Sequence, residues 1–442
     1  GSYSNWVFAK GYENFNEPIE NESDDEINLP LDSIKSNGSY ISKSYKTRFT
    51  LDIVSGNLQL SNVFGASGMT YFSFSDILGD HQIAFGTEMV LTLENSDYFF
   101  QYGYLKNKLD YYFTAFQNAN FFQVDYWSLV RLRHYGIQSM ISHPFSRFQR
   151  LDYGLAWHNI NYTKLEQEYN NFGQLEYIAD TSYTYSTILP SLSWVFDNSV
   201  FGITGPVEGF RQNTSMVISP GYGSNKLKFQ TIKSDLRKYW RIGKDYTVAV
   251  RGFFGKSLGP NKQKFFLGGV PYLIAGGGET NGLDDNGNFR EIILDDDNES
   301  LIHDVYFTEY AWPLRGARFG ERFGNTTALL NLEVRFPFIN YLALGFPLKV
   351  IFGNIRGHVF TDIGAAWDTH DTNGEFGEFN SKIWPGRYGT NIPGDYSPII
   401  ITSGLGTKIN LGYFLLKIEA AWDKNSNGYS KPQWYFSLGP DW

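Results

Sequence analysis

Cysteine is absent from the 442-residue chain, which excludes a disulfide scaffold, a thiolate metal site and a cysteine nucleophile. Long apolar runs are absent as well. A membrane-spanning helix needs about 18 or more apolar residues, and the longest candidate, Phe338 to Phe352, is broken by residues such as Asn340 and Pro347. Charged residues make up only 19% of the chain, and the formal net charge is -9. Because no basic field is available to attract phosphates, nucleic acid is not expected as a partner.

Aromatic residues, by contrast, are abundant. Phe, Tyr and Trp number 37, 30 and 11, or 18% together, and hydrophobic residues as a whole make up 42%. This content excludes a disordered chain, because it can build a large buried or lipid-facing surface. The mean hydropathy is nevertheless negative, at -0.32. The apolar residues must therefore be interspersed with polar ones.

The first 45 residues differ from the rest. They carry an acidic and polar run from Glu13 to Asp32, with neither helical periodicity nor strong alternation. We therefore expect residues 1–45 to form an acidic N-terminal linker or loop, followed by one domain over residues 46–442. No signal peptide is visible at Gly1, which does not indicate a cytoplasmic protein, because a mature chain lacks its leader.

From Lys46 onward, stretches of about ten residues alternate apolar side chains with polar or small ones, and Gly, Asn, Asp and Pro separate the stretches. This is the pattern of half-buried β-strands. We count about 16 such stretches up to Gly439, and none has the periodicity of an amphipathic helix. The pattern predicts an all-β fold and excludes βαβ architectures.

Three of the stretches show the two faces most plainly: Thr326–Phe336, Tyr413–Trp422 and Gln433–Gly439. In the first, the apolar face carries Ala328, Leu330, Leu332, Val334 and Phe336, and the polar face carries Asn331, Glu333 and Arg335. Such strands suit either a soluble sandwich, with the apolar face in a core, or a membrane barrel, with the apolar face in lipid.

Strand length and aromatic placement favour the membrane barrel. Stretches of about 9–11 residues or more that end in Tyr, Trp or Phe match bilayer-spanning strands with aromatic girdles, whereas soluble strands run to about 5–6 residues. An even number of strands can also close a barrel and remove the sheet edges. The sequence therefore predicts a transmembrane antiparallel β-barrel of about 16 strands, interrupted by one long loop.

The long loop is an interruption of about 70 residues, from Gly255 to Asn325. A loop of this length is expected to be either functional or disordered. Five short motifs follow one another from it to the end of the chain. They are Phe265-Phe-Leu-Gly-Gly269, Leu314-Arg-Gly-Ala317, Asn331-Leu-Glu-Val-Arg-Phe-Pro337, Phe360-Thr-Asp-Ile-Gly364 and Phe436-Ser-Leu-Gly-Pro-Asp-Trp442.

These motifs, in this order, resemble the BamA/TamA superfamily of outer-membrane assembly barrels, also called the bacterial surface antigen family. In that family an Arg-Gly motif lies at the tip of a loop folded into the lumen, and a Phe-x-Asp-x-Gly motif and a glutamate on the wall bind the arginine. The resemblance implies that the long loop of this chain is folded into the lumen. It implies a loop clamp made of Arg315, Gly316, Glu333, Phe360, Asp362 and Gly364. It also implies a C-terminal assembly signal at Phe436, Gly439 and Trp442.

The strand pattern supports the clamp independently. Alternation places Glu333 and Asp362 on polar faces, hence in the lumen, where a guanidinium can bind a carboxylate through two parallel hydrogen bonds. His358 shares the parity of Asp362 and is expected to face the lumen too. A pair buried in this way fixes geometry more than it adds net stability. In a passive member of the family the pair would only hold the loop, so it does not by itself indicate an activity.

Three features depart from the family pattern. Ala317 stands where the family usually has an aromatic residue, about 45 residues separate Gly269 from Arg315, and we expect no POTRA repeat or propeller in residues 1–45. The insertion and the segment Ser75-Asp-Ile-Leu-Gly-Asp-His81 resemble a subgroup whose barrels follow a TolB-like propeller.

Other sites are not expected. Gly282 stands where a calcium-loop pattern in the acidic insertion would need its first ligand, and the seven histidines lack metal-binding spacing. No motif singles out a Ser/His pair. We therefore predict no enzyme activity, no metal and no cofactor.

The resemblance implies a location in the bacterial outer membrane for the barrel, and two functions follow as hypotheses. In the first, it assists the assembly, insertion or translocation of outer-membrane or secreted proteins through a lateral seam, and the strand edge near Lys46–Val54 accepts a substrate strand. Gly439 and Pro440 would weaken that seam. In the second, it is a non-catalytic anchor or conduit for a periplasmic module or partner lipoprotein. Outer-membrane lipid is an expected partner in both, and unfolded outer-membrane proteins only in the first.

Overall fold

The computed structural model describes residues 45–61, 65–89, 96–123, 128–169, 175–222, 227–271, 273–276, 309–317, 322–345, 350–368, 382–383, 399–411, 415–425 and 428–439. The elements found in these residues are all β-strands, and they belong to one compact unit, Phe49–Trp442. The predicted boundary at residue 45 stays a prediction, because residues 1–44 lie outside the described part of the chain.

No helix among the described residues is long and apolar enough to cross a membrane.

The main feature is an antiparallel sheet of 19 strands in the described residues, three of which, β9 (Val200–Gly202), β14 (Leu273–Gly276) and β22 (Gly428–Tyr429), are short. The other sixteen pair in chain order, which confirms the predicted fold class and strand number. They are β1 (Phe49–Ser61), β2 (Gly65–Asp76), β3 (His81–Met89), β4 (Asp97–Tyr104), β5 (Asp110–Gln123), β6 (Ser128–Pro144), β7 (Gln149–Tyr169), β8 (Leu175–Asp197), β10 (Gly205–Pro220), β11 (Lys228–Ile242), β12 (Tyr246–Leu258), β17 (Thr326–Leu344), β18 (Val350–Trp367), β20 (Ile399–Asn410), β21 (Leu415–Asn425) and β23 (Gln433–Leu438).

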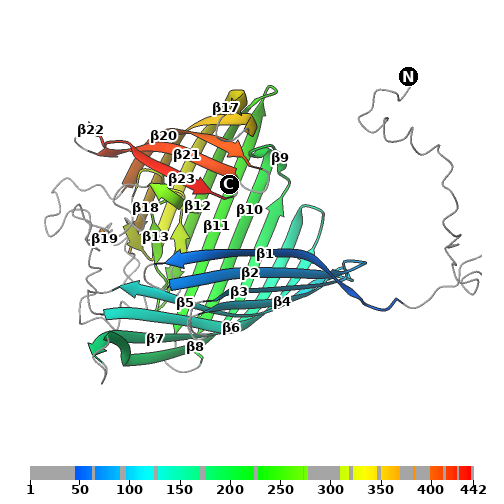
Figure 1. The fold of residues 1–442 in the computed structure, drawn as a ribbon, viewed down its shortest axis with the longest axis vertical. Coiled ribbons are helices and arrows are strands. Elements are labelled where there is room, and N and C mark those ends of the chain that lie inside the picture. Colours follow the sequence, from blue (N-terminus) through cyan, green and yellow to red (C-terminus); the bar gives the residue numbers. More distant parts are fainter. Residues whose placement is uncertain are drawn as a thin grey trace, which may run out of the picture. The chain divides into compact units, whose positions relative to one another are not determined.

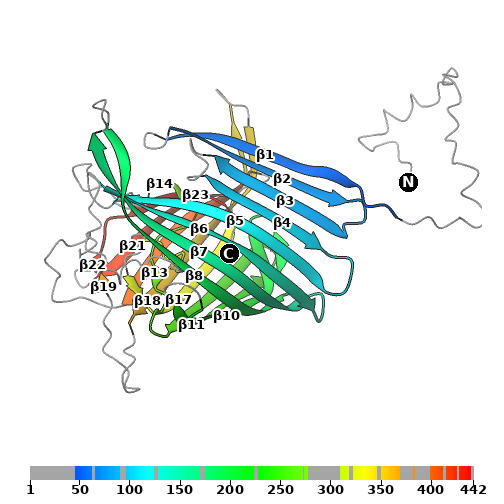
Figure 2. The same cartoon turned by 90° about the horizontal axis from the view of Figure 1, so that it is seen from below.

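The sheet curls around an interior, as Figures 1 and 2 show from two directions. Strand β1 pairs with β2, and β23 pairs with β21 and with the short strand β14. Within the described residues, no ladder joins β1 to β23. The first and last strands therefore form the two sides of a seam.

The burial pattern is the reverse of that in a soluble protein. Along β17, the apolar residues Leu332 and Val334 are 39% and 42% exposed, whereas the intervening Glu333 is 1% exposed and Arg335 is 5% exposed. Ionic groups line the interior and aliphatic groups the outside, which is the arrangement that a lipid environment requires. A sandwich with an apolar core, the alternative considered from the sequence, is excluded by this pattern.

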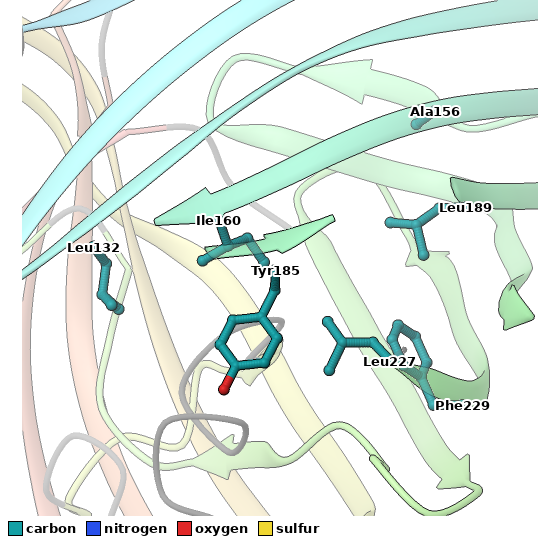
Figure 3. Packing of buried hydrophobic residues seen from close by; sticks show 7 residues of the cluster. All are labelled: Leu132, Ala156, Ile160, Tyr185, Leu189, Leu227 and Phe229. Carbon is teal, nitrogen blue, oxygen red and sulfur yellow. The ribbon is translucent and has the colours of Figure 1, made fainter. Parts of the chain in front are cut away.

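Part of the interior is apolar, which the sequence did not predict. Seven hydrophobic residues from β6, β7, β8, the start of β11 and the residue before it form one buried cluster, and Figure 3 shows where their side chains lie. They are Leu132, Ala156, Ile160, Tyr185, Leu189, Leu227 and Phe229. On β7 this face alternates with the exposed Leu155 and Trp157, so the cluster lies on the inner side of the sheet.

The long loop also contains structure that was not predicted. Its strands β13 (Phe265–Leu267), β15 (Glu309–Ala311) and β16 (Arg322–Gly324) form a small sheet with β19 (Lys382–Ile383), which lies between β18 and β20. Lys264 Nζ bonds Asp368 Oδ1 at 2.9 Å, and the Asn325 N–H donates to the same oxygen at 2.9 Å. These contacts fix both ends of the loop against the wall.

Candidate functional site in the lumen

The loop doubles back on itself before it reaches the site. The Leu314 N–H donates to the Gly269 carbonyl at 3.0 Å, and the Gly269 N–H donates to the Leu314 carbonyl at 3.3 Å. Around this bridge a fully apolar cluster joins the loop to β17, β18 and β20. Its members are Leu267, Ala311, Leu314, Ala317, Leu329, Ala366 and Ile400.

Two side chains from the wall bind loop carbonyls just before Arg315. Arg251 Nη1 on β12 donates to the Trp312 carbonyl at 2.5 Å, and Asn331 Nδ2 on β17 donates to the Pro313 carbonyl at 2.8 Å. The backbone that leads to Arg315 is therefore held in place, so that its guanidinium enters the wall in one geometry.

Arg315 is 2% exposed and binds three carboxylates. Its Nε and Nη2 donate to the two oxygens of Asp362 on β18, each at 2.8 Å, and its Nη1 donates to Glu419 on β21 at 2.8 Å and to Glu333 on β17 at 3.2 Å. The guanidinium carbon lies 3.5 Å from the centroid of the Phe360 ring. The N–H groups at the edge of the planar guanidinium thus bind carboxylates, and one of its faces stacks on an aromatic ring.

A second group of side chains balances the carboxylates. Glu333 accepts from Arg335 Nε at 2.7 Å and from Lys408 on β20, and Glu419 bonds His358 Nε2 at 2.8 Å. The site therefore contains three cations and three carboxylates, and all six are buried. The cations are Arg315, Arg335 and Lys408, and the carboxylates are Glu333, Asp362 and Glu419. We call this set the Arg315 cluster: Arg315, Glu333, Arg335, His358, Phe360, Asp362, Lys408 and Glu419.

Two glycines allow the loop to lie this close to the wall. Gly316 has φ +88°, and an added Cβ would lie 3.1 Å from Thr402 Cγ2 and 3.3 Å from Ala421 Cβ. A Cβ on Gly364 would lie 3.0 Å from Leu267 Cδ2. Both contacts are tighter than side chains normally allow, and the left-handed φ of Gly316 favours glycine in its own right.

The last strand reaches the same site through Tyr435. The Gly316 N–H donates to Tyr435 Oη at 2.7 Å. Of the residues assigned to the C-terminal signal, Phe436 points outward and is 37% exposed, and the Gly439 N–H donates to the Leu415 carbonyl at 3.1 Å. Strand β23 ends at Leu438, one residue before Gly439. Trp442 and Pro440 lie outside the described residues.

The comparisons with known proteins agree with this geometry. A family model described as the Omp85 superfamily domain matches residues 87–442. The chain belongs to the Omp85 superfamily. No curated protein sequence matches it at a significant level.

Solved structures resemble this Omp85 barrel at low sequence identity. A structure of BamA from Haemophilus ducreyi lacking POTRA domains 1-3 is 14% identical with a TM-score of 0.54, over 89% of this chain and 70% of that one. CdiB from Acinetobacter baumannii is 12% identical with a TM-score of 0.45, over 89% and 60%. CdiB from Escherichia coli is 10% identical with a TM-score of 0.42, over 90% and 64%. The chain thus spans less than two thirds of either CdiB.

Family membership places the protein in the bacterial outer membrane, as the resemblance in sequence implied. The outward aliphatic residues of the Omp85 barrel therefore contact lipid. Three residues of the predicted clamp contact the Arg315 side chain: Glu333, Phe360 and Asp362. The two predicted glycines lie where the loop packs against the wall, Gly316 beside Thr402 and Gly364 beside Leu267. The roles of the clamp and of the C-terminal signal stay predictions.

Several members of the site were not assigned from the sequence of this Omp85 protein. In the stretch Tyr413–Trp422, alternation places Glu419 with Lys417 on the polar face, but the bond of Glu419 to Arg315 depends on the order of strands around the barrel. Gly404 and Gly406 on β20 were missed too. An added Cβ on Gly404 would lie 2.2 Å from Phe360 Cζ, so this glycine makes room for the ring that stacks on the guanidinium.

Proposed function

We propose that this Omp85 barrel inserts or translocates polypeptides at the outer membrane, and that β1 pairs with an incoming strand through its free edge. Family membership supports protein insertion or translocation as the function. The fold is similar to that of BamA, and the chain spans 70% of that BamA structure. Unfolded outer-membrane proteins are the proposed substrates.

The observation that carries this proposal is the state of β1. It forms a twelve-residue ladder with β2 on one edge, from Phe49↔Asp76 to Ser61↔Gly65, with one register shift. In the described residues its other edge has no ladder. Ile53 and Val54 are neighbours that point to opposite faces, and they are 54% and 56% exposed.

An unpaired strand edge presents a row of N–H and C=O groups that another extended chain can pair with. Such strand addition obtains affinity from main-chain hydrogen bonds, which do not depend on the substrate's sequence. Burying the aliphatic side chains of β1 against an incoming amphipathic strand would add a hydrophobic contribution. This chemistry suits a barrel that handles many different strands.

The Arg315 cluster has a positioning role in this proposal and no catalytic one. Its hydrogen bonds join the loop to β17, β18 and β21, so that this wall stays fixed while the seam changes. Periplasmic proteins or lipoproteins that deliver substrates are proposed as further partners.

Disulfide capture tests the proposal, because the chain has no native cysteine. Val54→Cys in β1 is compared with Val359→Cys in β18, which is 45% exposed and paired on both edges. Each variant is placed in lipid vesicles with an unfolded outer-membrane protein that carries one cysteine in its last strand. A mixed disulfide is expected with Val54→Cys and not with Val359→Cys, together with faster reporter insertion than in protein-free vesicles.

Equal capture by both variants, or capture by neither, would contradict strand pairing at β1. If insertion also matched that of protein-free vesicles, the second hypothesis from the sequence, a membrane anchor or conduit, would replace the first. The Val359→Cys variant controls for cysteine exposure at the lipid face, since the two positions differ mainly in whether the strand has a free edge.

A further inference from the structure

The outer edge of the last strand is occupied by a segment of the long loop. Strand β14 pairs antiparallel with β23, with Leu273 opposite Ser437, Ala275 opposite Phe436 and Gly276 opposite Tyr435. Figure 2 shows the two strands side by side. In a closed barrel of sixteen antiparallel strands, the first strand β1 would lie beside β23 and run antiparallel to it. Strand β14 also runs antiparallel to β23. Strand β14 thus takes the position that β1 would have in a closed barrel.

The β14 ladder is short and interrupted. It contains three residue pairs, with a register shift between Leu273 and Ala275. On its other edge, β23 pairs with β21 over six consecutive residues, from Leu416↔Leu438 to Ala421↔Gln433, without a shift. A short ladder with a bulge is held by few main-chain hydrogen bonds, so β14 is the more easily displaced of the two neighbours.

The same loop also holds β23 from the inside. Opposite the backbone of Gly276 lies Tyr435, whose hydroxyl accepts the hydrogen bond from Gly316. Val270, three residues before β14, packs with Tyr435 and Phe360 in one buried cluster. Two separate parts of the loop therefore contact Tyr435 of the last strand: Gly276 pairs with its backbone, and the Gly316 N–H bonds its side chain.

We propose that Leu273–Gly276 is a resident edge strand, which occupies the seam edge of β23 at rest and leaves when another strand pairs there. Each N–H and C=O on a strand edge can serve one ladder at a time, so β14 and an incoming strand exclude each other. The resident strand keeps a reactive edge covered until a substrate arrives. The exchange step rests on the proposed function, whereas the occupancy of the edge does not.

Occupancy is tested first, without substrate. Cysteines are placed at Leu273 and Ser437 or, as a second pair, at Ala275 and Phe436, in the cysteine-free chain. The matched control is a pair at Ala115 and Ile137, which face each other in the ladder of β5 and β6. Opposed residues in a ladder are close enough for a disulfide. Both seam pairs should oxidise as completely as the control pair in the purified barrel, and failure of both beside an oxidised control would overturn the inference.

Exchange is tested next with the unfolded reporter in vesicles. Oxidised seam pairs should lose insertion activity, down to the rate in protein-free vesicles, and reduction should restore it, whereas the oxidised control pair should keep the parent rate. Seam pairs that work at the parent rate when oxidised would overturn the exchange step and leave the proposed function standing. A cysteine-free parent without any insertion activity would refute the proposed function instead, and occupancy would still be decided by the first measurement.

Discussion

Replacing Arg315 with alanine should lower the free energy of unfolding by about 3–5 kcal/mol, the usual result of removing one partner from a buried ion pair. The side chain is 2% exposed and donates to Asp362, Glu419 and Glu333 at 2.8–3.2 Å. After the change, Asp362 keeps the hydrogen bond from Asn331 Nδ2 at 2.8 Å but has lost its bidentate cation. The Arg315 cluster would then hold three buried carboxylates against two cations.

The measurement is urea unfolding of the refolded barrel in detergent, followed by tryptophan fluorescence, since the chain has 11 Trp residues. Arg150→Ala is the matched control. Arg150 bonds Asp152 at 3.1 Å, but its side chain is 51% exposed, and exposed pairs contribute about 0–1 kcal/mol. The free energy of unfolding of Arg315→Lys should lie between those of the parent and of Arg315→Ala, because lysine keeps the positive charge but cannot form the bidentate hydrogen bonds of a guanidinium. Similar losses in Arg315→Ala and Arg150→Ala would refute the argument that the buried cluster holds the loop.

Two further changes probe the contacts around the cluster with the same assay. Gly364→Ala should cost about 1–3 kcal/mol, because its Cβ would lie 3.0 Å from Leu267 Cδ2 in a packed site. Gly252→Ala, which would meet no atom within 4 Å, should be nearly neutral, and equal losses in the two variants would contradict the packing argument. Tyr435→Phe should cost about 1–3 kcal/mol by leaving the buried Gly316 N–H without its acceptor. Tyr153→Phe, at a residue 44% exposed, serves as the control, and no difference between the two would mean that this hydrogen bond is not needed.

The sixteen long strands could be predicted because a membrane strand shows its two environments in alternate residues. The prediction was weakest for strand segments that carry polar residues on both faces. Strands β7 and β8 run for 21 and 23 residues, longer than expected. In their distal parts Asn161 Nδ2 donates to Ser182 Oγ and Thr184 Oγ1 across the ladder, at 3.2 and 3.1 Å. Polar pairs of this kind stabilise a strand pair without any apolar alternation to reveal it.

The loop structure could not be predicted for a different reason. Strands β13 and β15 have three residues each, which is too few for a period of two to show. Strand β14 has four residues, and its partner β23 lies about 160 residues further along the chain. Alternation says which face a residue occupies and nothing about which strand lies beside it. For the same reason the bonds of Glu419 to Arg315 and of Lys408 to Glu333 could not be predicted, because they depend on the order of the strands.

The loop's described hydrogen bonds also make the two sides of the seam unequal. They attach it to β11 through Lys233 and Glu309 at 2.5 Å, to β12 through Arg251, and to β23 through Tyr435. A charge-balanced buried cluster adds little net stability compared with apolar packing, but it specifies one arrangement of the groups that it joins. The loop therefore fixes the C-terminal wall as a unit, whereas β1 depends on its ladder with β2. If the seam opens, the N-terminal strands are the side expected to move, because their movement breaks no ion pair of the Arg315 cluster.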